Sequence, residues 1–481
     1  MDRRSFIQTL AGATALASMP HAIAQSQRKP NIVFMLIDDL GWGDFGCYGS
    51  TFHETPNIDA LCREGMKFTH AYAGGPVCSP SRAALMTGQA PARIHITDWI
   101  PGTLLKDRKL TDAPILNQLP AGTPTLGTEM KKLGYHTCYV GKWHLGGEGS
   151  LPENFGFDIN YGGDHHGHPS WPSHYFGPFE AHNLGGYGKD DYLTEVLSDK
   201  ADSFLDEAAK SGKPFFLYLA EYAVHMPLQA REKLIEKYRQ KNGGKDDPDP
   251  IYAAMVETVD AAVGRLRNKL KSLGVEDNTI ILLTSDNGGV RFDAKKLHPI
   301  AENGPWRAGK GFLYEGGVRE PLIVYWPHVT KAGSTSDVPI TGMDFMPTLL
   351  HMVGGPAAPQ PCDGIDIVPV IQGAAVPKRT LYWHFPHYSG QGGMPASSML
   401  DGDWKLIEWL EDGHLELYNL RTDPGERYPL TSTFQARALK MQAQLHAWRE
   451  QIGAAMPTSN PNFGKPGGTI SKKKPKSSTE E

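Results

Sequence analysis

The sequence predicts an α/β fold in which a mainly parallel sheet is sandwiched between helices. Short, continuously apolar runs are typical of strands buried on both faces, as in parallel sheets. Helical periodicity lies between these runs, and alternating strands and helices imply doubly wound layers. The expected strands are residues 31–37, 137–140, 215–220, 279–284 and 322–326. The expected helices are residues 56–65, 79–87, 124–133, 191–210, 251–273 and 343–353.

Composition narrows the class of protein. The 481 residues are 40% hydrophobic, which excludes global disorder. The net charge of −5 argues against a nucleic-acid binder, which would carry a basic surface. We expect no stable membrane insertion, because no apolar run reaches the length that spans a bilayer. The 53 glycines and 37 prolines suit a loop-rich enzyme.

The N-terminus predicts export. Arg3 and Arg4 precede a weakly apolar stretch, and Ala22-Ile23-Ala24 fits a cleavage site for a signal peptidase. Paired arginines are typical of a twin-arginine export signal, so residues 1–24 are predicted to direct the chain to the periplasm or the extracellular space. An ordinary secretory signal and a frayed N-terminal helix are the alternatives.

The sequence predicts a larger domain at residues 25–378, expected to carry the functional site, and a smaller α+β subdomain at residues 379–455. In the subdomain, residues 404–410 and 414–419 flank Glu411-Asp412-Gly413, a pattern that favours a hairpin. An amphipathic helix is expected at residues 435–452. Residues 456–481, rich in Lys, Gly, Pro and Ser, are predicted to be a disordered tail.

Acidic residues follow two of the expected strands. Asp38 and Asp39 end the first strand, and Asp286 and Asn287 follow the strand at 279–284. Ligands bind beyond the carboxyl ends of parallel strands, and oxygen donors favour a hard cation such as Ca²⁺. The alternative for any one pair is an ordinary turn or helix cap.

A second set of residues carries nucleophilic and basic groups. A predicted helix begins with the segment Cys78-Ser79-Pro80-Ser81-Arg82. Cys78 is one of five cysteines in the chain. An odd cysteine count raises the question whether one has a separate role. Taken singly, the cysteine is equally consistent with a small buried hydrophobe. The accompanying basic residues, each more often structural when taken alone, are Lys142, His144, His225 and Lys310.

In this order, these motifs make the chain resemble the type I sulfatase family of the alkaline-phosphatase-like superfamily, over residues 30–455. The motifs that carry the resemblance are Asp38-Asp39-Leu40-Gly41, Cys78-x-Pro80-x-Arg82, Gly141-Lys142-x-His144, His225-x-Pro227, Ser285-Asp286-Asn287-Gly288, and Lys310 before Glu315-Gly316-Gly317.

The resemblance implies a mechanism. A maturation enzyme would oxidise Cys78 to Cα-formylglycine, whose hydrate is the nucleophile that attacks sulfur. Arg82 and Lys142 would hold that diol, and His144 would act as the base of the second step. His225 and Lys310 would bind the sulfate and assist the leaving group. The implied calcium ligands are Asp38, Asp39, Asp286, Asn287 and the formylglycine at position 78.

The motifs do not identify the alcohol. Residues 160–188 and 382–388 are rich in His, Trp and Tyr, which suits contact with sugar rings, so a sulfated saccharide is the expected substrate. The candidate sugar-binding residues are His166, His168, Trp171, His384 and His387. Two other functions stay open: a phosphodiesterase or phosphonate hydrolase of the same superfamily, and an inactive sugar-binding homologue.

Overall fold

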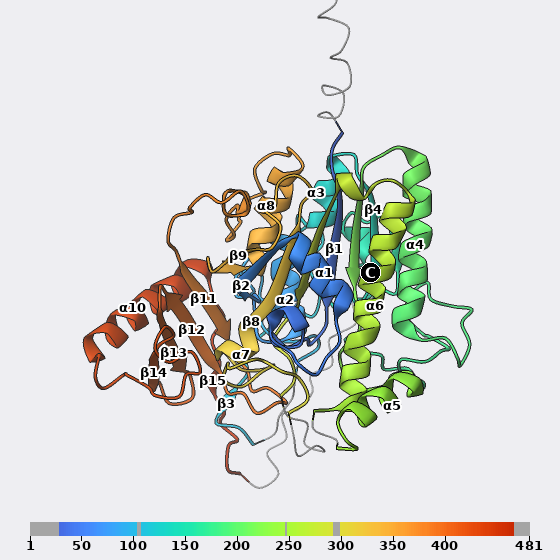
Figure 1. The fold of residues 1–481 in the computed structure, drawn as a ribbon. Helices are drawn as coiled ribbons and strands as arrows, with labels where there is room; N and C mark the ends of the chain where they lie inside the picture. The colour runs from blue at the N-terminus through green and yellow to red at the C-terminus, as the bar shows by residue number, and fades with distance from the viewer. Residues whose placement is uncertain (1–27, 103–106, 246–247, 292–298, 466–481) are drawn as a thin grey trace, which may run out of the picture.

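A large mixed sheet forms the centre of the structure (Figure 1). The structure is a computed structural model, and it describes residues 28–102, 107–245, 248–291 and 299–465. Within these ranges nine strands form the sheet, in the order β10-β2-β8-β7-β1-β6-β4-β5, with β9 paired to β2. The strands are β1 (Asn31–Ile37), β2 (Met66–Tyr72), β4 (His136–Gly141), β5 (Ile159–Tyr161), β6 (Phe215–Ala220), β7 (Thr279–Ser285), β8 (Arg319–Tyr325), β9 (Ser334–Ser336) and β10 (Ile340–Thr341).

The prediction of a mainly parallel sheet is confirmed, with one exception. β8 runs antiparallel to both of its neighbours, β7 and β2, whereas the other neighbouring strands pair in parallel. The sequence did not indicate the direction of β8. Its side chains are almost all buried, and an apolar run does not show in which direction a strand pairs with its neighbours.

Helices cover both faces of the sheet, as Figure 1 shows. Alternate residues of β1 point to opposite faces, so Val33 and Met35 enter one core cluster and Ile32 and Phe34 the other. The first cluster packs against α1 (Pro56–Glu64), α4 (Leu193–Ser211), α5 (Glu232–Lys241) and α6 (Pro250–Ser272). The second packs against α2 (Cys78–Thr87), α3 (Leu126–Lys132), α8 (Phe345–Met352) and α9 (Val368–Ile371).

A smaller antiparallel sheet lies beside the large sheet and its helices, to the left in Figure 1. Its strands, in the order β11-β12-β13-β14, are β11 (Thr380–Phe385), β12 (Ala396–Asp401), β13 (Trp404–Trp409) and β14 (Leu415–Asn419). The predicted hairpin corresponds to β13 and β14, and the predicted helix corresponds to α10 (Gln435–Ile452). The indole Nε1 of Trp383 donates to the carbonyl of Ala73 at 2.8 Å, which ties this sheet to the larger domain.

Part of the predicted tail is ordered against the larger domain. β15 (Thr458–Ser459) pairs with β3 (Leu110–Thr111), and Asn460 bonds the backbone at residues 108 and 109. The expectation of disorder is therefore wrong for this stretch. The rest of the predicted tail, residues 466–481, and the predicted export signal at residues 1–24 lie outside the described residues.

Some elements were not predicted. β2 mixes Lys67, Thr69 and His70 with apolar residues, so neither an apolar run nor a strict alternation marks it. α5 buries only Ile235 and Tyr238, too few apolar positions for a clear helical period. β11 and β12 were expected as part of the subdomain only.

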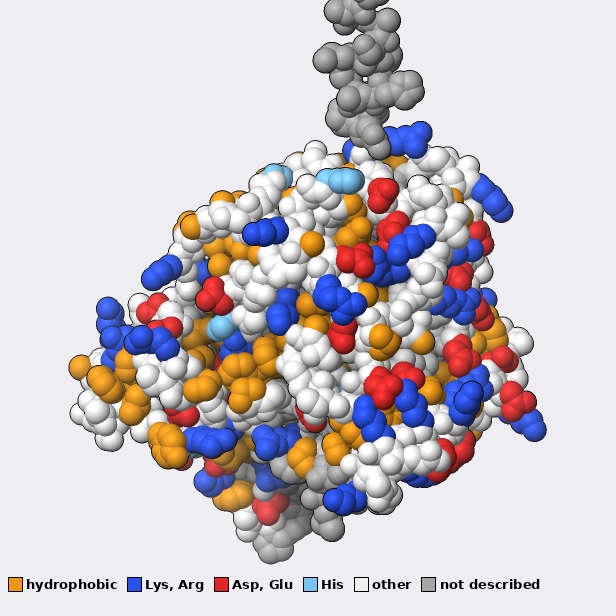
Figure 2. All heavy atoms as spheres, in the orientation of Figure 1, with side chains coloured by type: hydrophobic (Ala, Val, Ile, Leu, Met, Phe, Trp, Pro, Cys, Tyr) orange, Lys and Arg blue, Asp and Glu red, His pale blue; other side chains and the backbone are white. Residues whose placement is uncertain are grey.

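The face of the molecule in Figure 2 carries acidic and basic side chains interspersed over α4, α5 and α6. Pairs such as Arg265 with Asp199 and Lys269 with Asp206 link α6 to α4. Among the described residues, no helix has both the length and the apolar character that crossing a membrane requires.

A buried carboxyl group lies directly behind the sheet edge that will carry the site. Glu221 follows β6, its N–H donates to the carbonyl of Leu36, and the residue is 1% exposed. Burial raises the pKa of Glu221 from 4.5 to about 8, although the hydroxyl of Thr194 partly offsets it. Between about pH 4.5 and pH 8, the carboxyl group of Glu221 therefore keeps its proton in the native state and loses it in the unfolded chain.

Replacing Glu221 by Gln should make stability less dependent on pH. The protonated carboxyl contributes stability below pH 4.5, and this contribution is lost as pH rises toward 8. We expect Glu221→Gln and the wild type to have similar melting temperatures near pH 5. At pH 8 we expect the variant to melt at a higher temperature, with an unfolding free energy larger by on the order of 2 kcal/mol. Thermal melts at both pH values measure this. A constant difference between the two proteins at all pH values would contradict it.

Candidate active site

The acidic residues predicted from two separate strands lie at one edge of the sheet. β1 and β7 are parallel neighbours with Ile37 opposite Ser285, so the residues that follow them emerge side by side. The N–H of Asp39 donates to Oδ1 of Asp286 at 3.2 Å, and Nδ2 of Asn287 donates to Oδ1 of Asp39 at 2.8 Å. The residues that form this acidic edge, all at most 2% exposed, are Asp38, Asp39, Asp286 and Asn287.

Cys78 lies against this edge at the first position of α2. Its Sγ is 3.6 Å from Oδ1 of Asp38 and 3.3 Å from Nζ of Lys310. The residue is 2% exposed. The thiol therefore lies between an acid of one element and a cation of another.

Basic side chains pair with each of the carboxylates. Arg82, one turn after Cys78, donates from Nε to Oδ2 of Asp286 at 2.9 Å. Nζ of Lys142 lies 2.5 Å from Oδ2 of Asp38. Nζ of Lys310 lies 2.8 Å from Oδ2 of Asp39. Each of the three carboxylates thus has a cationic partner, and one member of two of these pairs contacts the thiol.

Gly141 allows Lys142 to reach Asp38. Its φ is +100°, and a Cβ at this position would lie 1.8 Å from the carbonyl oxygen of Ala220 in β6. Only glycine fits such close contact between strands. The Gly141-Lys142 pair in the sequence therefore combines a tight strand end with the cation that follows it.

Burial and neighbouring charges act differently on the three carboxyl groups. Burial, followed by repulsion from Asp286, raises the pKa of Asp38 well above its usual value. Burial, the largest single cause, would also raise the pKa of Asp39, but the combined attraction of Lys310, His225 and Lys142 lowers the pKa below the usual range. For Asp286, burial is again the largest single cause, but Arg82, Lys142 and Lys310 together outweigh it and the pKa is lowered.

Two histidines offer unprotonated nitrogens. Nε2 of His144 lies 2.7 Å from the carbonyl of Ile100, which can only accept, so Nε2 carries the proton. Its Nδ1 is buried and has no hydrogen-bond partner among the described residues. In His225, Nδ1 lies 2.6 Å from the carbonyl of Met226, so the free nitrogen is Nε2, 3.4 Å from Asp39. Burial is the largest cause that lowers the pKa of both rings.

The thiol, imidazole and ammonium groups described above line one cavity of about 570 Å³. Cys78, His144, His225 and Lys310 are part of its wall. Other parts of the wall come from loops far apart in the sequence, with Trp99 and Pro101 from one, His165 to His168 from another, and Gln391 from the C-terminal part of the chain. A nucleophile, free imidazole nitrogens and a cation thus face one space large enough for an anionic ligand.

Comparisons with known proteins agree with this geometry. The sulfatase family model matches residues 30–355, and the model of the N-sulphoglucosamine sulphohydrolase C-terminal region matches residues 305–452. The chain belongs to the sulfatase family. It is therefore a sulfuric ester hydrolase with the alkaline-phosphatase-like fold.

The sulfatase is similar to whole proteins of this family. It is 30% identical to rat (Rattus norvegicus) N-acetylgalactosamine-6-sulfatase, with 87% of this chain and 84% of the relative covered. It is 31% identical to a sulfatase of Formosa agariphila, with 88% and 89% covered. The crystal structure of Ps i-CgsB in complex with k-i-k-neocarrahexaose matches with a TM-score of 0.75 at 31% identity, covering 88% of this chain and 93% of that one.

Of the residues predicted to contact a sugar, the sulfatase brings two to the cavity. His166 and His168 line it, and the ring of His168 lies 5.9 Å from that of His225. Gly167, between them, packs on the ring of His144, where a Cβ would come within 2.4 Å of Cε1. The loop of residues 165–168 therefore covers the ring of His144 directly.

The other three predicted sugar-binding residues, Trp171, His384 and His387, do not line the cavity, so the prediction of sugar contact is corrected for them. Trp171 is 1% exposed and packs edge-on against Tyr222. His387 is 1% exposed, with Nε2 2.8 Å from the hydroxyl of Thr97. His384 lies in β11, where Nδ1 contacts the hydroxyl of Ser397 at 2.7 Å and Nε2 contacts the carbonyl of Ala455 at 2.8 Å. Aromatic and histidine-rich composition did not distinguish packed rings from exposed ones.

Asp164 was missed. Its Oδ1 lies 2.6 Å from Nδ1 of His166 and accepts the N–H of the same residue at 2.8 Å, which fixes the ring at the cavity. This hydrogen bond, the largest cause, raises the pKa of His166. An acid two residues before a histidine is a local turn signal that was available in the sequence. Trp99 and Gln391 carried no such signal.

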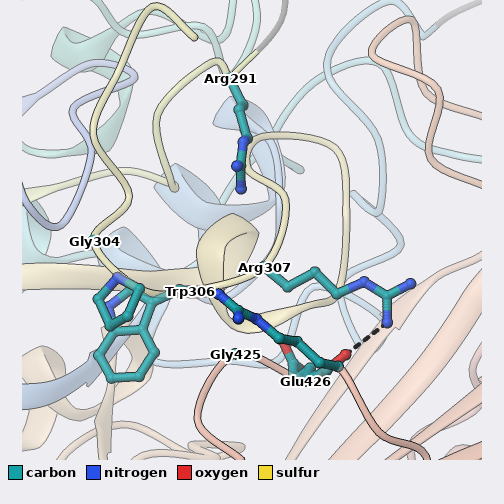
Figure 3. Close-up of a pocket in the computed structure, with 8 residues that line it drawn as sticks. Arg291, Gly304, Trp306, Arg307, Gly425 and Glu426 are labelled. Carbon is teal, nitrogen blue, oxygen red and sulfur yellow. Dashed lines mark hydrogen bonds between the residues drawn. The ribbon is translucent and has the colours of Figure 1, made fainter.

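A second cavity, of about 420 Å³, lies between residues 304–307 and 425–427 (Figure 3). Arg291, Trp306 and Arg307 line it, and Nη1 of Arg307 donates to the carbonyl of Glu426 at 2.8 Å. Among the described residues that line it there is no cysteine, histidine or lysine. The predicted catalytic residues Cys78, His144, His225 and Lys310 line the other cavity instead.

Replacing His384 by Ala should lower stability and leave substrate preference unchanged. The change leaves the carbonyl of Ala455 without its imidazole donor and leaves Arg449 as the remaining partner of the Ser397 hydroxyl, at a cost of about 1–3 kcal/mol. We expect a lower melting temperature and the same ratio of kcat/KM between a sulfated saccharide and an aryl sulfate. A selective loss on the saccharide would restore the original hypothesis of sugar contact.

Proposed function

We propose that this sulfatase is exported and hydrolyses sulfate esters of sulfated saccharides, with a formylglycine made from Cys78 by a maturation enzyme and with a bound Ca²⁺. The observation that carries the proposal is the position of Cys78. It lines the cavity at the first turn of α2, within hydrogen-bond distance of Lys310 and beside the acidic edge.

The acidic edge fits a calcium ion. All of its donors are oxygens of carboxylates and one amide, the set that hard cations prefer. Oδ1 of Asn287 is buried and has no hydrogen-bond partner in the described part of the chain, while its Nδ2 is bonded to Asp39. An amide oriented with its oxygen unused is suited to a metal ligand. Asp38, Asp39, Asp286, Asn287 and the modified residue 78 would hold the ion, which would supply positive charge against a sulfate oxygen.

The formal charges of the paired side chains around Cys78 sum to zero when no metal ion is counted. Each of the three carboxylates is paired with one cation, so the formal charges cancel when all three acids are ionised, and burial lowers the pKa values of both neighbouring histidines, which favours their neutral forms. A divalent cation would make the site positive by two charges. A positive, water-poor pocket stabilises a sulfate ester and the negative charge that grows on it during reaction.

The residues around Cys78 are placed to hold and orient the nucleophile. Formylglycine supplies a hydrated aldehyde, one hydroxyl of which attacks sulfur while the other allows the enzyme to release sulfate. Lys310 lies 3.3 Å from Sγ of Cys78, so it can donate to an oxygen at that position. Arg82 and Lys142 hold Asp286 and Asp38 beside it.

The two histidines are placed for proton transfer. The unpartnered Nδ1 of His144 can accept a proton, which suits a general base. Nε2 of His225 lines the cavity beside Asp39, and a bound anion there favours its protonation. A protonated Nε2 can pass its proton to the departing alcohol oxygen, as Lys310 can.

A sulfated saccharide is the proposed substrate class. The rat relative is named as an N-acetylgalactosamine-6-sulfatase, and the Ps i-CgsB structure holds a neocarrahexaose. In this chain, His166 and His168 occupy the cavity wall beside Trp99, a combination of polar tips and aromatic faces that suits a sugar ring. The arginine pair and small-residue site near the N-terminus support export to the periplasm or beyond.

Active protein should carry the modification, and activity should follow it. We expect the peptide containing residue 78 to be lighter than the unmodified one by about 18 Da, because sulfur and two hydrogens are exchanged for oxygen. Cys78→Ala should remove turnover, by at least about 10³-fold, without lowering the melting temperature. An aryl sulfate, an aryl phosphate and a phosphonate monoester are assayed in parallel. Preference for phosphate or phosphonate, or full activity with unmodified Cys78, would overturn the proposal.

Calcium binding should depend on the amide oxygen of Asn287. Asn287→Ala should reduce bound calcium, measured by elemental analysis, and reduce the rise in melting temperature that added Ca²⁺ produces in the wild type. Asn287→Asp keeps an oxygen at the position and serves as the matched variant, which should retain the metal. Unchanged stability and activity after exhaustive chelation would contradict the assignment of calcium.

His166 should select the saccharide. His166→Ala removes a side chain that Asp164 holds at the cavity wall, and an unsatisfied sugar hydroxyl costs about 1–3 kcal/mol. We expect kcat/KM on a sulfated saccharide to fall roughly 5- to 150-fold, with little change on an aryl sulfate. Equal losses on both substrates would indicate a catalytic or structural role instead.

A further inference from the structure

The second cavity of the structure is lined by arginines (Figure 3). Its volume is about 420 Å³, and the arginines of its wall come from three separate segments: Arg291, Arg307 and Arg427. In Figure 3 the side chain of Arg291 extends toward Trp306 and Arg307. A cleft lined by charges of one sign concentrates ions of the opposite sign. This space, called the arginine cavity below, is therefore suited to an anion.

The one acid of the wall is engaged elsewhere. Glu426 is the only acidic residue among the described residues that line the arginine cavity, and it is 0% exposed. Its Oε2 accepts the N–H of Glu315 at 2.7 Å, and its Oε1 lies 3.2 Å from Nζ of the buried Lys405. Burial, the largest cause, raises the pKa of Glu426 to about 7, which reduces its negative charge further. The carboxyl group therefore balances Lys405 inside the fold and not the arginines of the cavity.

Arg307 is fixed in the wall and keeps unused hydrogen-bond donors. Its guanidinium carbon lies 3.8 Å from the centre of the Tyr314 ring. Nη1 donates to the hydroxyl of Tyr418 at 3.0 Å and to the carbonyl of Glu426 at 2.8 Å. In the described part of the chain, Nε and Nη2 have no hydrogen-bond partner and Arg307 forms no ion pair. A guanidinium group that is held in this way can offer its other N–H groups to a ligand.

Arg427 adds an exposed cation to the same wall. Its backbone N–H donates to Oδ2 of Asp423 at 2.8 Å, which holds the start of the side chain. Its Nε lies against Gly425, where a Cβ would come within 3.3 Å of it. No carboxylate of the described residues pairs with the guanidinium group of Arg427. Its charge is therefore available to a ligand.

Trp306 gives the arginine cavity a rigid apolar wall. The residue is 9% exposed, and the guanidinium carbon of Arg319 lies 3.9 Å from the centre of its ring. Trp42 packs edge-on against it at 5.3 Å, and Pro305 lies beside it in the lining. Apolar walls beside a few cations suit a sugar ring that carries an anionic group.

The arginine cavity and the active site are built from the same chain segments. Arg291 closely follows Asn287 in the sequence, and Arg307 closely precedes Lys310. The N–H of Lys310 donates to the carbonyl of Gly289 at 3.1 Å, which holds the two segments together. A ligand of several sugars is a class of molecule that can present anionic groups to both places.

We propose that the arginine cavity is a second sulfate site, which binds a sulfate group that the enzyme does not hydrolyse. Guanidinium groups bind oxyanions through paired N–H donors, and a sulfate group keeps its charge at any working pH. The described residues of the wall include no cysteine, histidine or lysine, so the cavity binds and does not cleave. The inference rests on the proposed function for the source of the group, a sulfated saccharide. A free sulfate ion, the product of hydrolysis, has the same chemistry.

Calorimetric titration of the full-length chain tests the proposal. Cys78→Ala, which should not turn over substrate, is titrated at constant ionic strength with a chondroitin-6-sulfate hexasaccharide, with the same hexasaccharide after desulfation, and with sodium sulfate. Adding Arg291→Gln and Arg427→Gln should weaken binding of the sulfated hexasaccharide by at least roughly 10-fold and leave that of the desulfated one unchanged. An equal loss for sodium sulfate would assign the site to the free ion as well, and a loss for sodium sulfate alone would assign it to the free ion only.

Two arginines outside the cavity serve as the matched control. Arg421→Gln together with Arg437→Gln removes the same charge from exposed positions of the C-terminal subdomain and should change the affinities by less than about 2-fold. Arg427→Gln alone replaces an exposed side chain, so it keeps the test decisive if the double variant fails to fold, and it should weaken binding by roughly 3-fold or more. The proposal is overturned if neither the sulfated hexasaccharide nor sodium sulfate binds, or if the cavity and control variants bind them equally well.

Activity on a small substrate separates this proposal from the proposed function. In the wild-type background, Arg291→Gln with Arg427→Gln should leave kcat/KM on an aryl sulfate unchanged, because such a substrate does not reach the second site. A loss on the aryl sulfate would overturn the second site in favour of a role in the active site. Binding that depends on these arginines in a chain that cleaves no sulfate ester would contradict the proposed function alone.

Discussion

The site depends on one electrostatic constraint: charged side chains removed from water must compensate one another. The buried acids after β1 and β7 would repel each other strongly if they stood alone. Each has a cationic partner at 2.5–2.9 Å, drawn from a different part of the chain. The pairs are Lys142 with Asp38, Lys310 with Asp39 and Arg82 with Asp286. The formal charges of the three pairs cancel, so the metal ion proposed above would create the positive charge that an anionic substrate needs.

The backbone is shaped to bring these partners together. Asp39 has a φ of 59°, a left-handed conformation that aspartate tolerates better than most residues and that redirects the chain at the end of β1. Gly141 permits β4 to end in close contact with β6, which delivers Lys142. α2 places Cys78 and Arg82 one turn apart on the same face, so a single short helix supplies both the nucleophile position and the partner of Asp286.

The residues proposed for catalysis and those proposed to select the substrate lie in different parts of the fold. The groups that would handle sulfate stand at the ends of strands or in the first turn of a buried helix, where packing fixes them. The groups placed to meet the alcohol, such as His166 and Trp99, come from loops over the cavity. Loops accept changes in sequence more readily than the sheet does, so one scaffold can serve different sulfated alcohols.

The sequence by itself determined the α/β class, most of the strands and helices, and the catalytic and metal-binding candidates, because these depend on local signals. Continuous apolar runs mark β1, β6 and β7, and polar residues directly after a buried strand mark its functional end. The tertiary structure decided which candidates meet. It paired Lys142 with Asp38, reversed β8, ordered residues 458–459 against β3, and separated His166 from His384. His166 and His384 lie in equally aromatic, polar segments, and only the packing of β11 against β12 and the chain near Ala455 buries the second ring. Such contacts join residues far apart in the chain, and no local pattern of residues encodes them.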